Sequence, residues 1–192
     1  MGRKWGRFWL DFFACLLIPA YTLLFAGSVQ WFGTNFSVIA VTGPDHYRGF
    51  IYWGVLAGGY FFVMLNKLAA LLPRGWMRLG VRLLAVCAVL SLAYALAIPY
   101  LPQFFPKYAA LHVVLAAGAC VLLMVALQFI ILVMSRKDPA RWSGPRRMCW
   151  VMVVGCVVLF LIPQMVSSAL EVFFTISAAL LARKMWLLGR YG

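Results

Sequence analysis

The side chains that could do chemistry are few, because the chain has only four acidic residues and two histidines. Asp45 and His46 end a polar loop. His112 and Glu171 each lie about one helical turn into an apolar stretch. An ionisable group inside a membrane is costly and by default faces other helices or a water-filled cavity. We therefore expect these residues to converge at one depth, on one side of a membrane.

Glu171 is predicted to face the protein interior rather than lipid. Ser168, Glu171 and Thr175 recur at helical spacing, and the small residues that follow continue the same face. A carboxylate on that face needs a partner, because burying an unpaired charge is costly. The expected partners are His112, His46, Arg48 or Lys107.

Three interpretations of this polar group remain open. It can be a hydrogen-bonded cluster that locks the helices, a pocket for a lipid headgroup or small ligand, or a catalytic or metal site. Two histidines and two carboxylates can bind zinc, but no HxxxH or HExxH motif places two ligands on one helix face. Ser37, Ser167 and Ser168 are candidate nucleophiles without a GxSxG motif. We expect no metal, no cofactor, and a binding role rather than an enzymatic one.

The favoured interpretation is a polar pocket beneath the headgroups of the non-cytoplasmic leaflet. In this pocket His112 and Glu171 would hold a lipid headgroup, while Arg48 and Lys107 would pair with its phosphate. The residues assigned to the pocket are Ser37, Asp45, His46, Arg48, Lys107, His112 and Glu171.

The elements that must position these residues are membrane-spanning helices. The chain of 192 residues is 66% hydrophobic and 11% charged, whereas a soluble domain is about 45–50% apolar and about 25% charged. A helix needs about 20 apolar residues to cross the hydrocarbon core. Six stretches approach this length, so we predict a single all-α domain, a bundle of six transmembrane helices. Their expected ranges are 8–32, 50–72, 79–101, 108–134, 148–163 and 167–188.

The connections are expected to be short, apart from an outer loop at 33–49 and an inner loop at 135–147. Pro139, Gly144 and Pro145 should block a helix in the inner loop. The first stretch is longer than the apolar core of a signal peptide, about 7–15 residues, so we interpret it as an uncleaved span. Residues 148–182 are too long for one crossing, and Pro163 and Gln164 indicate a tight outer hairpin.

Lysine and arginine predict the topology. All 17 except Arg48 and Lys107 lie before the first span, at the junction of the second and third, between the fourth and fifth, or near the chain end. Short loops rich in these residues stay on the cytoplasmic side, so both termini are predicted to be cytoplasmic. The net charge of +13 is interpreted as this signal and not as a nucleic-acid surface. The residues expected to touch anionic inner-leaflet lipids are Arg136, Lys137, Arg141, Arg146 and Arg147.

Other residues predict how the helices meet. Gly54 and Gly58 form a GxxxG motif, which serves close packing inside the bundle, a homodimer face or a contact with another membrane protein. Tryptophans such as Trp142 are expected in aromatic belts at the membrane interfaces. Asp11 is expected to pair with Arg7. The five cysteines show no CxxC spacing and are interpreted as small apolar fillers.

One arrangement resembles a known family. The residues that carry it are Asn35, Phe36, Ser37, Val38, Ile39 and Gly43 in the outer loop, Leu111 and His112 in the fourth span, and Ala169, Leu170 and Glu171 in the sixth. With six spans and two cytoplasmic ends, they resemble the DRAM/Frag/Sfk-type membrane family and its bacterial relatives of unknown function. The resemblance implies lipid-linked work at the non-cytoplasmic leaflet, with Ser37, His112 and Glu171 as the positions that carry over. Family members often have an acidic residue where Val38 stands here.

We therefore expect a multi-pass membrane protein that binds phospholipid or glycolipid headgroups and acts in membrane-lipid homeostasis. Two alternatives remain: an integral membrane enzyme acting on a lipid or lipid-linked substrate, and an accessory subunit of a larger membrane complex. The expected location is the bacterial plasma membrane, or a eukaryotic endomembrane.

Overall fold

The computed structural model describes residues 8–27 and 29–191 and confirms the all-helical six-span bundle. The first span, Phe8–Ala26, contains the π-helical turn η1 (Phe13–Leu17) and α2 (Ile18–Ala26). The others are α4 (Pro44–Ala69), α5 (Gly75–Ala97), α6 (Pro106–Lys137), α7 (Pro139–Leu161) and α8 (Ser168–Tyr191), and a short helix, α3 (Phe36–Ala40), lies in the first connection. The protein is a multi-pass integral membrane protein.

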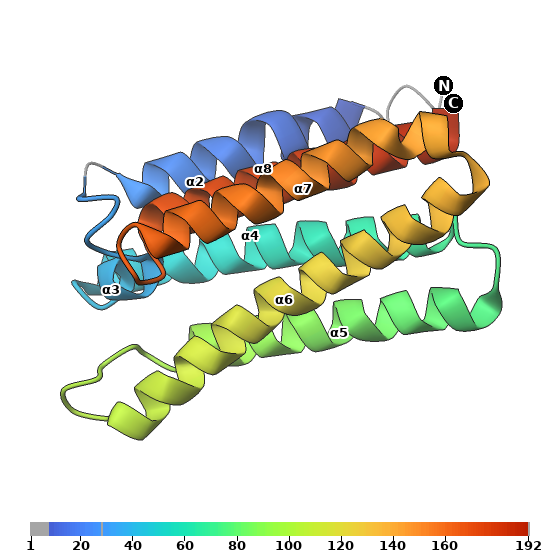
Figure 1. Ribbon diagram of the computed structural model, residues 1–192. Helices are drawn as coiled ribbons and strands as arrows, with labels where there is room; N and C mark the ends of the chain where they lie inside the picture. Colours follow the sequence, from blue (N-terminus) through green and yellow to red (C-terminus); the bar gives the residue numbers. More distant parts are fainter. Residues whose placement is uncertain (1–7, 28, 192) are drawn as a thin grey trace.

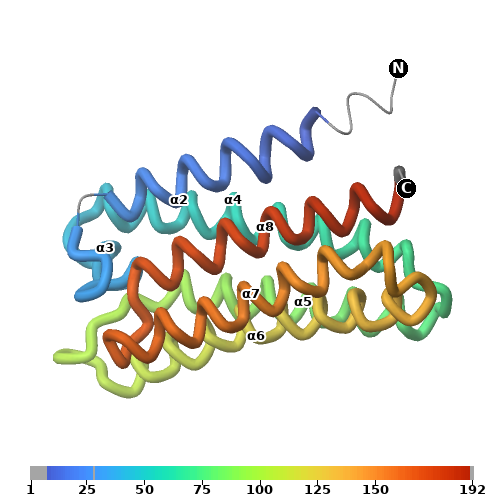
Figure 2. The backbone as a smooth tube through the Cα atoms, turned by 45° about the horizontal axis from the view of Figure 1, so that its top comes forward, coloured from blue at the N-terminus to red at the C-terminus, as the bar shows by residue number. Residues whose placement is uncertain are grey.

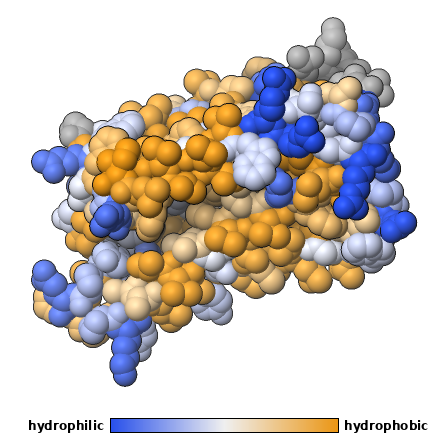
Figure 3. Space-filling view, in the orientation of Figure 1, coloured by the Kyte–Doolittle hydropathy of each residue, from blue (hydrophilic) through white to orange (hydrophobic). Residues whose placement is uncertain are grey.

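Helices α4 and α8 lie at the centre of the bundle (Figures 1 and 2). Helix α2 packs against both, α7 packs on α8, and the α5–α6 hairpin packs on α4, with α6 also touching α7. We call the end of the bundle that carries α3 the outer end and the opposite end the inner end. Figure 3 shows apolar residues over the middle of the visible face and hydrophilic residues towards its two ends, as a membrane-spanning bundle requires.

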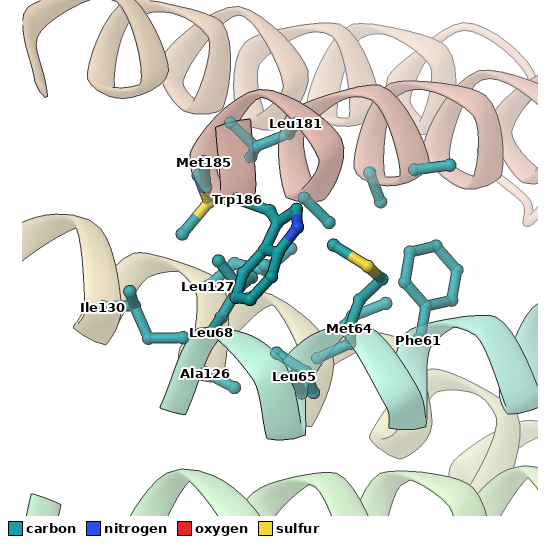
Figure 4. Close-up of a cluster of buried hydrophobic side chains, with 14 of the residues drawn as sticks. Phe61, Met64, Leu65, Leu68, Ala126, Leu127, Ile130, Leu181, Met185 and Trp186 are labelled. Atoms are coloured by element: carbon teal, nitrogen blue, oxygen red, sulfur yellow. The ribbon is translucent and has the colours of Figure 1, made fainter. Parts of the chain in front are cut away.

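The core in the inner half of the bundle forms where α4, α6 and α8 meet (Figure 4). Leu68, Leu127 and Met185 are fully buried there, and Trp186 packs among them. Trp142, at the start of α7, is only 2% exposed. The expectation of an interface belt is therefore wrong for Trp142, because the helix face on which it lies, rather than its depth, decides its surroundings.

The first span is a helix only as far as Ala26, although the apolar sequence continues to residue 32. Gly27 has a φ of 57°, a backbone conformation that glycine adopts without steric cost. Within the span, the π-helical turn η1 ends at Leu17, two residues before Pro19, whose missing N–H removes one helical hydrogen bond. The early end of α2 leaves the following residues free to form the connection that leads to α3.

The prediction of an inner loop at 135–147 is wrong, because only Asp138 separates α6 from α7. Proline is compatible with the first position of a helix, where Pro139 lies. The Asp138 side chain caps α7 by accepting a hydrogen bond from the Arg141 amide at 3.0 Å. Pro145 lies inside α7, where it removes one backbone hydrogen bond without ending the helix.

The split of residues 148–182 into two helices is confirmed. Helix α7 ends at Leu161 and α8 begins at Ser168, so the turn between them lies at the outer end. Gln164 has a φ of 52° in this turn, a left-handed conformation that ends a helical path.

An ion pair joins the first span to α8 near the inner end. The Nε atom of Arg183 lies 2.6 Å from Oδ1 of Asp11. Arg7, the partner predicted from the sequence, lies outside the described residues.

The GxxxG motif of α4 packs against α5 within the chain. Gly54 and Gly58 are both buried, and a Cβ atom added to Gly54 would lie 2.3 Å from Cδ1 of Leu96. A Cβ atom added to Gly58 would lie 3.1 Å from Cδ2 of Leu92. The two glycines therefore let α4 and α5 approach closely.

Gly54→Ala is expected to lower the free energy of unfolding by about 1–3 kcal/mol, because the added methyl overpacks the α4–α5 contact. Gly59→Ala is the matched control, since nothing lies within 4 Å of its added Cβ. The control should leave stability unchanged or raise it, because alanine favours helix over glycine. Denaturant titration in mixed micelles measures both variants. Equal stability of the two would contradict the close contact at Gly54.

Candidate functional site at the outer end

A short helix in the outer connection places Ser37 against the bundle. Asn35 caps α3, with its side-chain oxygen accepting a hydrogen bond from the Val38 amide at 2.9 Å. Phe36 is fully buried, and its ring packs edge-on against Phe25 and Trp53, with centroids 5.1 and 5.0 Å away. These two anchors hold the first turn of α3, and the hydroxyl of Ser37 reaches α6.

Ser37 and His112 form a hydrogen-bonded pair. The Ser37 Oγ atom lies 2.7 Å from Nε2 of His112, and Nδ1 lies 2.8 Å from the carbonyl oxygens of Ala95 and Ile98 at the end of α5. Carbonyl oxygens only accept hydrogen bonds, so Nδ1 carries the proton. In the neutral imidazole, Nε2 then accepts the hydroxyl proton of Ser37. His112 is 2% exposed, with the ring of Tyr100 packed 5.7 Å from it.

Glu171 fastens α3 to α8. Its Oε2 atom accepts a hydrogen bond from the Phe36 amide at 2.6 Å. The same junction is tied a second time, because the amide and hydroxyl of Ser168 donate to the Thr34 carbonyl at 2.7 and 3.2 Å. The expectation that Glu171 pairs with His112, His46, Arg48 or Lys107 is therefore wrong, because its carboxylate accepts a main-chain hydrogen bond instead. In residues 8–27 and 29–191, no ion pair joins Glu171 to a lysine, arginine or histidine.

The structure brings together Ser37, His112 and Glu171 around α3, and we call these three residues the outer polar cluster. The other four predicted pocket residues lie outside it, on the surface of the outer end. Asp45 and Arg48 pair with each other at 3.4 Å and are both highly exposed. The exposed ring of His46 hydrogen-bonds Thr42 at 2.7 Å, and Lys107 is exposed at the start of α6.

A hollow of about 470 Å³ lies between α3 and the end of α2, and we call it the outer hollow. It opens beside the end of α2, where Leu24 is 79% exposed and available to lipid. The residues that line it include Leu24, Gln30, Thr34, Val38, Thr42 and His46. Of the predicted pocket residues, His46 therefore lines this hollow, while Ser37 lies on the adjoining face of α3.

No family model, curated protein or solved structure matches this chain. The chemistry open to it therefore follows from the geometry of its own residues. Within the described part of the chain, no group of three or more His, Cys, Asp or Glu residues could hold a metal ion. The outer polar cluster offers the Ser37 hydroxyl, hydrogen-bonded to an imidazole nitrogen of His112. The carboxylate of Glu171 holds α3, the helix that carries Ser37.

The residues that sequence reasoning missed contribute through their main chain. The carbonyl of Thr34 and the amide of Phe36 carry no side-chain signal, because every residue except proline has both groups. Asn35 did offer a signal, since asparagine is among the preferred helix N-caps. The apolar run that follows it is too short for a span, so a helix there was not expected.

Proposed function

We propose that the protein binds a phospholipid headgroup in the outer hollow and acts in membrane-lipid homeostasis. The observation that carries the proposal is the hollow of about 470 Å³ at the outer end of the bundle, a volume within the range of small-molecule sites. The distribution of lysine and arginine supports a non-cytoplasmic position for this end. The resemblance to a lipid-linked membrane family points the same way. We place the protein in a bacterial plasma membrane, with a eukaryotic endomembrane as the alternative.

The lining of the outer hollow suits a molecule with a polar head and an apolar stem. Thr42 and His46 offer a hydroxyl and an imidazole, and Gln30 offers an amide. Leu24 and Val38 are apolar, and the exposure of Leu24 leaves a path for an acyl chain from the surrounding lipid. Arg48 follows His46 by two residues on α4 and therefore lies on the opposite face of the helix, where it pairs with Asp45, so the lining of the hollow itself supplies the contacts to the headgroup.

The outer polar cluster holds α3 in place, and α3 forms part of the wall of the outer hollow. Both nitrogens of His112 are occupied by protein partners, and Glu171 holds the Phe36 amide. Their role in headgroup binding is therefore to position α3, because Val38 and Thr42, on α3 and just after it, form one wall of the hollow.

His46→Phe is expected to reduce phospholipid retention at least about tenfold, because it keeps a ring but removes both polar nitrogens. The measurement is native mass spectrometry of protein taken from vesicles of phosphatidylethanolamine and phosphatidylglycerol. His46→Gln, which keeps a hydrogen-bonding group, should retain lipid, and Lys107→Gln, outside the hollow, should match the wild type. A wild type that carries no phospholipid, or a His46→Phe variant that carries as much as the wild type, would refute the proposal.

We propose a second lipid contact at the inner end, where anionic lipids would meet the basic residues around the α6–α7 turn. Arg136, Lys137, Arg146 and Arg147 are exposed. Arg141 is half-buried, and its guanidinium donates to the Leu188 carbonyl. Each basic residue near an anionic surface contributes about 1 kcal/mol of attraction. Because a single residue, Asp138, joins α6 to α7, these charges lie close together at the inner end.

A further inference from the structure

The hydrogen bonds of His112 define a geometry beyond what headgroup binding needs. A serine nucleophile requires a base within about 2.6–3.2 Å and a third group that orients the base. Ser37 Oγ lies 2.7 Å from Nε2, and the carbonyls of Ala95 and Ile98 fix Nδ1–H at 2.8 Å each. We propose that Ser37 and His112 are a nucleophile and its general base, and that they cleave or transfer the carboxylic ester of a membrane lipid.

The orientation of the base favours proton transfer in one direction. Two carbonyl oxygens on Nδ1–H select the tautomer whose Nε2 lone pair faces the Ser37 hydroxyl. When Nε2 takes the proton, the same two oxygens stabilise the imidazolium that forms, as the carboxylate does in a Ser–His–Asp triad. His112 is buried and its ring packs against the ring of Tyr100, so the imidazole keeps this orientation.

The position of Ser37 suits an ester of a lipid. His112 lies about 9 Å below the start of α6, at 1.5 Å per residue from Pro106. Helix α6 has 32 residues and is about 48 Å long, whereas the hydrocarbon core is about 30 Å thick. If α6 is centred in the core, about 9 Å from its end falls at the boundary between hydrocarbon and headgroups, next to the ester bonds of glycerolipids. Ser37 is only half-buried, so this residue reaches the surface of the bundle. Its neighbour Val38 lines the outer hollow, and the choice of a phospholipid substrate therefore rests on the proposed function.

The reaction balances without a cofactor. The Ser37 oxygen attacks the ester carbonyl carbon while its proton passes to Nε2 of His112. The ester C–O bond breaks, His112 returns that proton to the leaving lipid hydroxyl, and the acyl group stays on Ser37. Water, or the hydroxyl of a second lipid, then gives a proton to Nε2 of His112 and attacks the acyl carbon. The bond between the acyl carbon and the Ser37 oxygen breaks, and His112 passes its proton to that oxygen, which releases the fatty acid or the new ester and restores the Ser37 hydroxyl.

Glu171 acts in this scheme as a positioning residue. It holds the amide of Phe36, the residue before Ser37, at 2.6 Å. This contact and the buried ring of Phe36 leave the serine little freedom to turn away from His112. The carboxylate itself touches neither Ser37 nor His112 by any hydrogen bond among the described residues.

The experiment uses the full chain in phosphatidylglycerol vesicles with a fluorophosphonate probe, which reacts covalently with activated serines. Peptide mass spectrometry should find the probe on Ser37 and nowhere on Ser37→Ala. His112→Gln should slow labelling about 100-fold or more, in keeping with the contribution of a general base. Ser143→Ala, at the opposite end of the bundle, should label like the wild type. Release of fatty acid from the vesicles should follow the same order.

Folded wild type that neither labels at Ser37 nor releases fatty acid would overturn the inference, as would labelling at Ser37 that is unchanged in His112→Gln. If His112→Gln does not fold, Ser37→Ala decides alone, because it removes a single hydroxyl. The two proposals fail separately. Lipid retention that depends on His46 without a reactive Ser37 leaves only the binding site, whereas a reactive Ser37 with His46-independent retention leaves only the nucleophile.

Discussion

Trp142→Ala is expected to lower the free energy of unfolding by about 3 kcal/mol. Trp142 is among the largest fully buried side chains and packs in the core of the inner half of the bundle. Replacing a buried tryptophan with alanine leaves a cavity that costs about 3–5 kcal/mol. The lower value applies here, because in a membrane the exposed side chain meets lipid rather than water and only the lost packing counts.

Trp150→Ala is the control for this prediction, since Trp150 lies on the same helix and is 59% exposed. We expect the control to change stability by less than about 0.5 kcal/mol. Steric trapping or unfolding in mixed micelles gives both values. Similar losses for the two variants would mean that Trp142 faces lipid, and the interface belt predicted from the sequence would then stand.

Glu171→Leu is expected to free α3 from the bundle. The leucine leaves the Phe36 amide without its acceptor, and an unsatisfied buried donor costs about 1–3 kcal/mol. Because the loss falls on one junction, the effect should be local. Hydrogen exchange of the amides in Phe36–Ala40 should speed up about tenfold or more, while the core amides of α4 and α8 keep their protection.

Glu171→Gln separates the hydrogen bond from the charge. Its side-chain oxygen can still accept from Phe36, so exchange in α3 should stay within a few-fold of the wild type. If glutamine loosens α3 as much as leucine does, the negative charge matters in itself, and Glu171 must face a cation or a ligand. That result would return Glu171 to the headgroup role expected from its sequence position.

Glu171→Leu and Trp142→Ala should differ in their effects on the proposed site. Loosening α3 moves Ser37 away from His112 and moves Val38 away from the outer hollow, so Glu171→Leu should impair both lipid retention and probe labelling. Trp142→Ala acts at the inner end and should reduce overall stability without a specific effect on either property, when the measurements are made below its unfolding transition.

The positions of two residues in the outer polar cluster could be predicted from the sequence, but their hydrogen-bond partners could not. His112 and Glu171 were expected inside the bundle near one end, because an ionisable side chain in an apolar stretch must face other helices. Their partners were not predictable. Glu171 accepts from a backbone amide of α3, and His112 donates to two backbone carbonyls at the end of α5. Backbone groups are present in almost every residue, so the sequence does not indicate which of them will be partners. Asp45, His46, Arg48 and Lys107 share the end of the bundle but lie at its exposed surface.

The sequence by itself determined the six-span architecture. Backbone polar groups in lipid must bond within their own segment, so an apolar run of membrane length has one common solution, the helix. Only the tertiary structure decided which faces those helices bury, where α6 turns into α7, and that the first connection folds into α3. Hydropathy is a property of single residues summed along the chain. A hydrogen-bond partner, such as the Phe36 amide for Glu171, depends on how two helices that are distant in the sequence pack against each other. Local composition does not determine that packing angle.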